Sequence, residues 1–175
     1  MEKLDELYLA MAEYYAKDPK RVQHFVKVHS FARLIGRAEG LKDKELFTLE
    51  AAALVHDIGI KAAEKKFGSC SGRLQEMEGP AIAEEMLDKL GFEQDVTERV
   101  SYLVGHHHTY KNVDGADYRI LLEADALVNA YEDESPEAAV RAAYDRVFRT
   151  ETGRALCRLM FLSGCLLYTS PSPRD

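Results

Sequence analysis

The sequence predicts an all-α protein built as a single helical bundle. Apolar residues recur three and four positions apart along most of the 175-residue chain, which is the spacing of one face of a helix. No stretch alternates apolar and polar residues as a half-buried strand would, and no internal repeat is present. The composition, 46% hydrophobic and 30% charged, is that of a globular protein able to bury one core.

Eight helices are expected, separated by glycine, proline and capping residues. They cover residues 2–16, 19–39, 43 to a break at Gly59, 80–90, 95 to the histidines at 106, 117–132, 135–149 and 150–164. Asp18-Pro19 and Ser135-Pro136 supply capping and first-turn residues for two of them. Residues 66–79 are rich in glycine and serine, so we expect a loop there.

The last part of the sequence differs from everything before it. Helical periodicity stops near Gly164, and the string that follows, CLLYTSPSPRD, contains two prolines. This string resembles the translation of a common sequencing adaptor. We therefore expect residues 165–175 to be a non-native tail and residues 1–164 to form one domain. An ordinary disordered tail is the alternative.

Charge and composition exclude several classes of protein. With a net charge of −7 the chain lacks the basic character of a protein that binds a nucleic acid polymer. No apolar run is long enough to predict a membrane span, and the acidic, amphipathic start is unlike a secretory signal. Cys70, Cys157 and Cys165 form neither a zinc knuckle nor a disulfide pattern. We expect a cytoplasmic protein with a small-molecule partner; the pattern leaves a homo-oligomer open.

Most of the histidines form an ordered set with two aspartates. The set is His24, His56-Asp57, His106-His107-His108 and Asp125. Imidazole nitrogen and carboxylate oxygen are ligands that divalent iron, manganese and zinc accept. His24 shares a helix face with Val28 and Ile35, whereas His29 shares its face with Arg33. His24 is thus the ligand candidate, and a core histidine bonded to a carbonyl is the alternative.

The pair His56-Asp57 follows an apolar run and precedes a glycine, at the expected end of a helix. Two adjacent side chains can both turn toward one ion where a helix ends, and the two oxygens of Asp57 could bridge two ions. A histidine that interacts with the helix dipole is the alternative for His56. Asp125 lies in the apolar segment LLEADALVN, where a carboxylate needs a metal or an arginine as partner.

The triple histidine follows the apolar segment VSYLVG. His107 lies three and seven residues after Val104 and Val100, so we expect it to point with the core face. His106 is in phase with Leu103, and His108 is expected to face away. A solvated helix end is the alternative for the whole run.

The order His…His-Asp…His-His…Asp on a helical chain resembles the HD superfamily of metal-dependent phosphohydrolases. The segment HFVKVHSFARLIGRAEGL resembles the opening helix of HD domains when His24 is the ligand. His56-Asp57 followed by Ile58-Gly59 resembles the defining doublet, and Ala124-Asp125 resembles the last element of the pattern. The resemblance covers residues 20–130, and similar small bacterial HD-domain proteins extend it to nearly the whole chain.

The resemblance implies one or two bound divalent ions, with iron or manganese expected ahead of zinc. The first ion would be held by His24, His56, Asp57 and Asp125. In HD proteins with two ions, including those of the HD-GYP branch, two adjacent histidines complete a second group, which here would be His106 and His107. That branch carries a histidine where this chain has Glu78. Glutamate can also be a ligand, and an acid favoured by a helix N-terminus is the alternative for Glu78.

The implied activity is hydrolysis of a nucleotide or another small phosphoester by metal-activated water. Asp57 and Lys61 are the catalytic candidates, and Lys61, Arg73 and Lys111 are candidates for contacts with substrate phosphate. Solvated side chains are the alternative for these three basic residues. An HD-fold oxygenase with two iron ions and a non-catalytic nucleotide-sensing module are the alternative functions.

Overall fold

The computed structural model describes residues 1–162, and within that range it contains helices and no strand, so the all-α prediction is confirmed. Residues 165–175, expected to be a non-native tail, lie outside the described residues. The helices are α1 (Lys3–Tyr14), α2 (Pro19–Ala38), α3 (Asp43–Val55), α4 (Ile60–Phe67), α5 (Gly72–Lys89), α6 (Gln94–Val104), α7 (Gly115–Glu132), α8 (Glu137–Arg146) and α9 (Glu151–Phe161).

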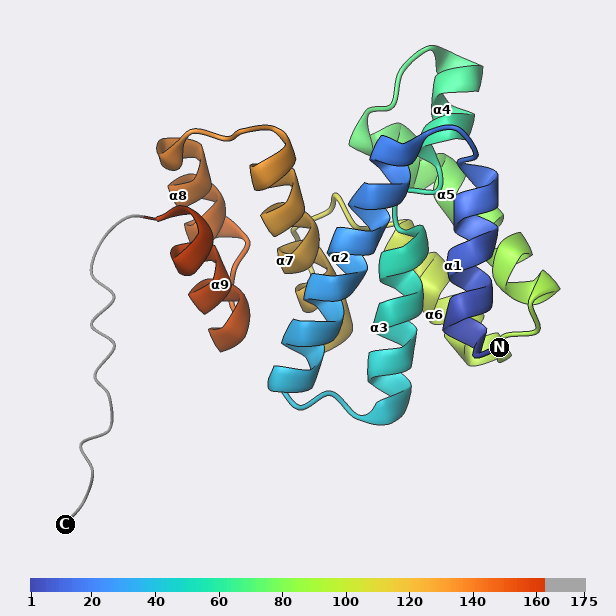
Figure 1. The fold of residues 1–175 in the computed structure, drawn as a ribbon, viewed down its shortest axis with the longest axis horizontal. Helices are drawn as coiled ribbons and strands as arrows, with labels where there is room; N and C mark the ends of the chain where they lie inside the picture. The colour runs from blue at the N-terminus through green and yellow to red at the C-terminus, as the bar shows by residue number, and fades with distance from the viewer. Residues whose placement is uncertain (163–175) are drawn as a thin grey trace.

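Helix α3 lies at the centre of the bundle because it has almost no polar face. Every residue from Thr48 to Val55 is buried, and α3 packs against α1, α2, α6 and α7. Figure 1 shows α2 and α7 running beside it, with α1, α4, α5 and α6 at one end and the α8–α9 pair at the other. Pro19 begins α2, and the Asp18 side chain accepts a hydrogen bond from the backbone of Arg21, as the sequence predicts.

The predicted loop over residues 66–79 is wrong. Helix α4 ends at Gly68, which has the left-handed φ of +66° that favours glycine, and α5 begins only four residues later, at Gly72. Gly79 lies inside α5, where the helix backbone passes close to the backbone of Gly59. A Cβ atom added to Gly59 would lie 2.7 Å from the backbone nitrogen of Gly79. These glycines therefore mark a close crossing of two backbones, whereas the sequence analysis interpreted Gly59 as a helix break and Gly79 as part of a loop.

The α8–α9 pair is attached to α7 through a buried carboxylate. Glu123 is fully buried on α7 and accepts hydrogen bonds from the backbone nitrogens of Arg149 (2.6 Å) and Thr150 (2.9 Å) and from the Thr150 hydroxyl. Thr150 in turn caps α9 through Gly153. Within the described part of the chain, no helix combines the length and apolar character needed to cross a membrane.

Candidate metal centre

Four parts of the fold bring the histidines and aspartates together. His24 lies in the second turn of α2, and His56 and Asp57 directly follow α3. His107 and His108 lie in the turn after α6, and Asp125 lies in the middle of α7. The ends of α3 and α6 thus meet the first turns of α2 and the middle of α7.

The first group consists of His24, His56, Asp57 and Asp125. The Nε2 atoms of His24 and His56 are 3.2 Å apart. Asp57 Oδ2 lies 3.5 Å from His24 Nε2 and 3.6 Å from His56 Nε2. Asp125 Oδ1 lies 3.4 Å and 3.6 Å from the same two nitrogens. Two imidazoles and two carboxylates therefore converge on one point.

The second group consists of Asp57, His107 and His108. Asp57 Oδ1 lies 2.9 Å from His107 Nε2 and 4.0 Å from His108 Nε2. The ligand atoms of each trio, His24-His56-Asp57 and Asp57-His107-His108, are close enough together to hold a metal ion. Asp57 directs one oxygen at each group, so the two groups are adjacent and share this carboxylate.

The imidazole rings are oriented by hydrogen bonds at their outer nitrogens. Nδ1 of His56 donates to the Ala53 carbonyl (2.9 Å), and Nδ1 of His107 donates to the Val104 carbonyl (2.8 Å). A carbonyl only accepts, so both Nδ1 atoms carry a proton, and each inward-facing Nε2 atom is left to bind a metal or a second proton. The Nε2 atoms of His24 and His56 lie 3.2 Å apart, and two nitrogen lone pairs at that distance require a cation or a shared proton between them. The residues present therefore fit a divalent ion.

The charges of the centre favour bound positive charge. Burial lowers the pKa of His24. The hydrogen bond to Asp125 and the charges of Asp57, Asp125 and Glu132 outweigh burial and raise the pKa to about 9. Burial raises the pKa of Asp57, while the charge of His56 and the hydrogen bond and charge of His107 hold it below its usual range. The carboxylates are thus ionised, and the imidazoles bind either protons or a metal.

The structure corrects the expected roles of His106 and His108. His106 lies outside both groups: its ring stacks on Tyr102 with centroids 4.2 Å apart, and its Nδ1 donates to the Tyr102 carbonyl. His108, expected to face away, lies in the second group instead. The helical phase fails because α6 ends at Val104, so the residues after it follow a turn. The Tyr118 hydroxyl, 2.6 Å from the carbonyls of His106 and Thr109, fixes that turn.

Glu78 also lies outside both groups, and its carboxylate pairs with Lys66 Nζ at 2.6 Å. The side chains that reach the second group from α5 are those two and three residues before Glu78. Gln75 Oε1 is 3.1 Å from His108 Nε2, and Glu76 Oε1 accepts a hydrogen bond from the His108 backbone. The sequence analysis missed both because it placed them in a loop.

A cavity of about 280 Å³ opens onto the first group, and its lining includes Lys20, Arg21, His24, Asp57 and Asn129. The described residues that line this cavity do not include the expected substrate contacts Lys61, Arg73 and Lys111. Lys61 Nζ instead donates to the Tyr14 carbonyl at 2.7 Å. Lys20 and Arg21 precede His24 by four and three residues, a spacing that puts all three on one helix face.

Comparison with known proteins identifies the family. A model of the HD domain family matches residues 21–149, which include every member of both groups. Neither the curated proteins nor the solved structures contain a match to the chain. HD domains bind divalent metals, and each of the two groups described above could hold such an ion. Because the match covers well over half of the sequence, this chain belongs to the HD domain family.

Proposed function

We propose that the protein is a metal-dependent phosphohydrolase that cleaves a nucleotide or another small phosphoester. The observation that carries this proposal is the position of Asp57, whose two oxygens are divided between two histidine groups at the inner end of a cavity. Adjacent sites that share a carboxylate are suited to holding two divalent ions. We propose iron or manganese, because the donors are imidazole and carboxylate and no cysteine takes part in either trio.

The protein side chains divide the remaining tasks. A bound divalent ion lowers the pKa of water and polarises a phosphoryl oxygen. Asp57 and Asp125 supply the negative charge that holds such an ion, and Asn129 Nδ2 donates to Asp125 Oδ1 at 2.9 Å and so orients it. Lys20 and Arg21 are the basic residues of the cavity wall, which also carries Asp18, Asp57 and Glu132. Arg21 pairs with Asp18 (2.9 Å) and Glu64 (2.7 Å), so it would have to exchange a carboxylate for a substrate phosphate. We assign the phosphate contact to Lys20 and Arg21 in place of Lys61.

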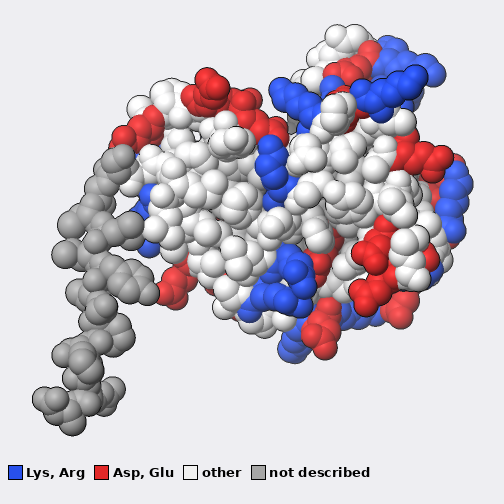
Figure 2. All heavy atoms as spheres, viewed as in Figure 1, with Lys and Arg blue, Asp and Glu red and all other residues white. Residues whose placement is uncertain are grey.

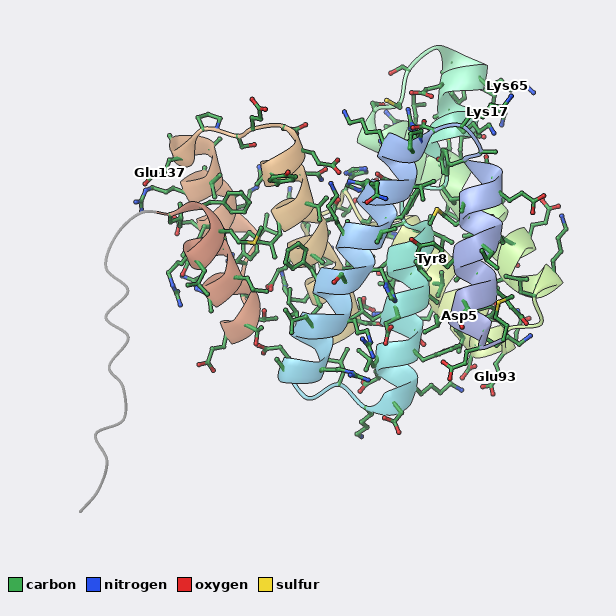
Figure 3. The ribbon with its side chains drawn as sticks, in the orientation of Figure 1. Asp5, Tyr8, Lys17, Lys65, Glu93 and Glu137 are labelled. Atoms are coloured by element: carbon green, nitrogen blue, oxygen red, sulfur yellow. The ribbon has the colours of Figure 1, made fainter. Side chains whose placement is uncertain are left out.

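The size of the cavity supports a small substrate. A volume of about 280 Å³ is at the lower end for ligand pockets, which suits a small phosphoester better than a polymer. Figure 2 shows basic side chains gathered over α4, although the whole chain is acidic. Figure 3 shows Lys17 and Lys65 pointing outward at this same end of the molecule. Helix α4 begins at Ile60, which lines the cavity, so positive charge over this helix would draw an anion toward it.

The test is metal content and phosphate release by protein purified without a histidine tag. Plasma mass spectrometry should find iron or manganese in the wild type and in Asp133→Ala, a matched change at an exposed aspartate. Asp57→Ala should lose the metal, since both groups lose a ligand. With Mn²⁺, the wild type should release phosphate from members of a panel of nucleotides and phosphoesters, and Asp57→Ala should not.

Other outcomes point to the alternative functions. If the wild type binds no metal even after anaerobic loading, the result would favour a non-catalytic nucleotide-sensing module. A protein that binds two iron ions, consumes oxygen and releases no phosphate would be an oxygenase. Either result would overturn the hydrolase proposal.

A further inference from the structure

One face of α5 holds His108 through three residues spaced as one helical stripe. Gly72, Gln75 and Glu76 lie at positions i, i+3 and i+4. A Cβ atom on Gly72 would lie 2.7 Å from His108 Cγ, so the ring packs directly against this glycine. Glu76 Oε1 accepts hydrogen bonds from the His108 backbone (3.0 Å) and the Thr109 hydroxyl (2.9 Å). The position of His108 therefore depends on the first turns of α5.

The side-chain amide of Gln75 is buried and has a defined orientation. Its Nε2 donates to the Cys70 carbonyl at 2.7 Å. A carbonyl cannot donate, so this contact identifies which end of the amide is nitrogen. The oxygen, Oε1, is then the atom that faces His108 Nε2, at 3.1 Å. An oxygen lone pair of Gln75 thus points at the edge of the second group.

Two of the separations in the second group match those of neighbouring ligands on one ion, and the third, 4.0 Å between Asp57 Oδ1 and His108 Nε2, is wider. Ligands that lie about 2.1 Å from an ion and at right angles to each other are about 3.0 Å apart. The distance from Gln75 Oε1 to His108 Nε2 is 3.1 Å, and that from Asp57 Oδ1 to His107 Nε2 is 2.9 Å. Side-chain amide oxygens are ligands for hard divalent cations.

We propose that Gln75 Oε1 is a neutral ligand of a second ion, together with Asp57, His107 and His108, and that this ion is the weaker and more exchangeable of the two. The inference rests on the proposed metal-dependent function. The first group has two carboxylates, whereas the second has only the shared Asp57 and an uncharged amide. His108 is also 29% exposed, while the His24 and Asp125 side chains are 8% and 5% exposed. Fewer charges and more water both weaken binding.

The test is a calorimetric titration of the full-length, metal-free protein with Mn²⁺. The wild type should bind two ions, the second at least about tenfold more weakly than the first. Gln75→Glu replaces the neutral oxygen by a charged one of the same size and should tighten the second step by about 10-fold or more, leaving the first unchanged. Gln75→Ala should weaken the second step by a similar factor. Gln94→Glu, the same change on the exposed side of α6, should alter neither.

The outcomes separate this inference from the proposed function. Binding of no ion by the wild type would overturn both. Binding of two ions with the second step unchanged in both Gln75 variants would overturn only the role of Gln75. If Gln75→Glu and Gln94→Glu strengthen binding of the second ion equally, net charge alone is responsible, and the role of Gln75 is overturned. Binding of only one ion by the wild type would overturn this inference and leave the first group as the site of the proposed function. Circular dichroism of each variant confirms that the helices are intact.

Discussion

At the scale of single residues, Glu132 orients His24, a member of the first group, although Glu132 itself is not part of that group. Its Oε2 accepts a hydrogen bond from His24 Nδ1 (3.0 Å), and its Oε1 pairs with Lys27 Nζ (2.6 Å). The contact selects the tautomer of His24 whose Nε2 can bind a metal. The sequence contains no sign of it, because 108 positions separate the two residues.

We therefore expect Glu132→Ala to weaken Mn²⁺ binding at the first group by about 10- to 100-fold, since the His24 ring loses its partner. Competition with a fluorescent chelator measures this affinity. Lys27→Ala keeps the contact between Glu132 and His24 and should change the affinity far less. Equal losses in both variants would show that charge near the cavity matters and the orientation of His24 does not.

The two described cysteines should differ in reactivity with pH. Burial raises the pKa of the Cys157 thiol to about 11, whereas Cys70 is exposed. Because only the thiolate reacts, Cys157 gains reactivity only as the pH rises toward 11. At pH 8, iodoacetamide should alkylate Cys70 and leave Cys157 unmodified until denaturant is added, as peptide mass spectrometry would show. Rapid labelling of Cys157 in the native protein would mean that α9 detaches from α7.

At the scale of elements, the turn after α6 depends on α7 through Tyr118. Burial raises the pKa of this phenol to about 12, so the folded protein keeps it protonated at pH values where the unfolded chain ionises it. Its contribution to stability is complete below about pH 10 and is lost as the pH rises through 12.

Tyr118→Phe should reduce the free energy of unfolding by about 1 kcal/mol at neutral pH, because the carbonyls of His106 and Thr109 lose their donor. The variant should also lose less stability than the wild type between pH 9 and 11. Urea unfolding at several pH values measures both effects. Identical alkaline slopes in the two proteins would contradict this role.

Element boundaries explain which parts of the centre could be predicted from the sequence. His24 lies inside a regular helix, so its face could be derived from spacing alone. His106 and His108 lie beyond the last turn of α6, where helical spacing no longer applies, and their predicted orientations were reversed. Gln75 was missed because the glycines around it favour a loop in the sequence. In the structure Gly79 instead lets α5 approach Val104, whose Cγ1 would lie 2.6 Å from an added Cβ.

At the scale of the whole molecule, an ion in the centre would join α2, α7 and the segments that follow α3 and α6. Such an ion binds the folded state and not the unfolded chain. At 100 times its dissociation constant, Mn²⁺ should add about 2.7 kcal/mol to the free energy of unfolding and raise the melting temperature by about 5–10 °C. Scanning calorimetry with Mn²⁺ or with EDTA measures the difference. Asp57→Ala should have the same melting temperature with Mn²⁺ and with EDTA. A difference in melting temperature for that variant would indicate that Mn²⁺ binds elsewhere.

The attachment of the last two helices has a consequence for how the protein matures during synthesis. Glu123 and Asp125 lie two residues apart on α7, so one carboxylate serves the metal centre and the other receives the backbone of Arg149 and Thr150. A nascent chain that ends before Thr150 would have to bury the charge of Glu123 without those donors, which is strongly unfavourable. The helix that carries Asp125 therefore reaches its final packing only after residues 149–153 have left the ribosome. Binding of a metal ion through Asp125 would follow that packing step.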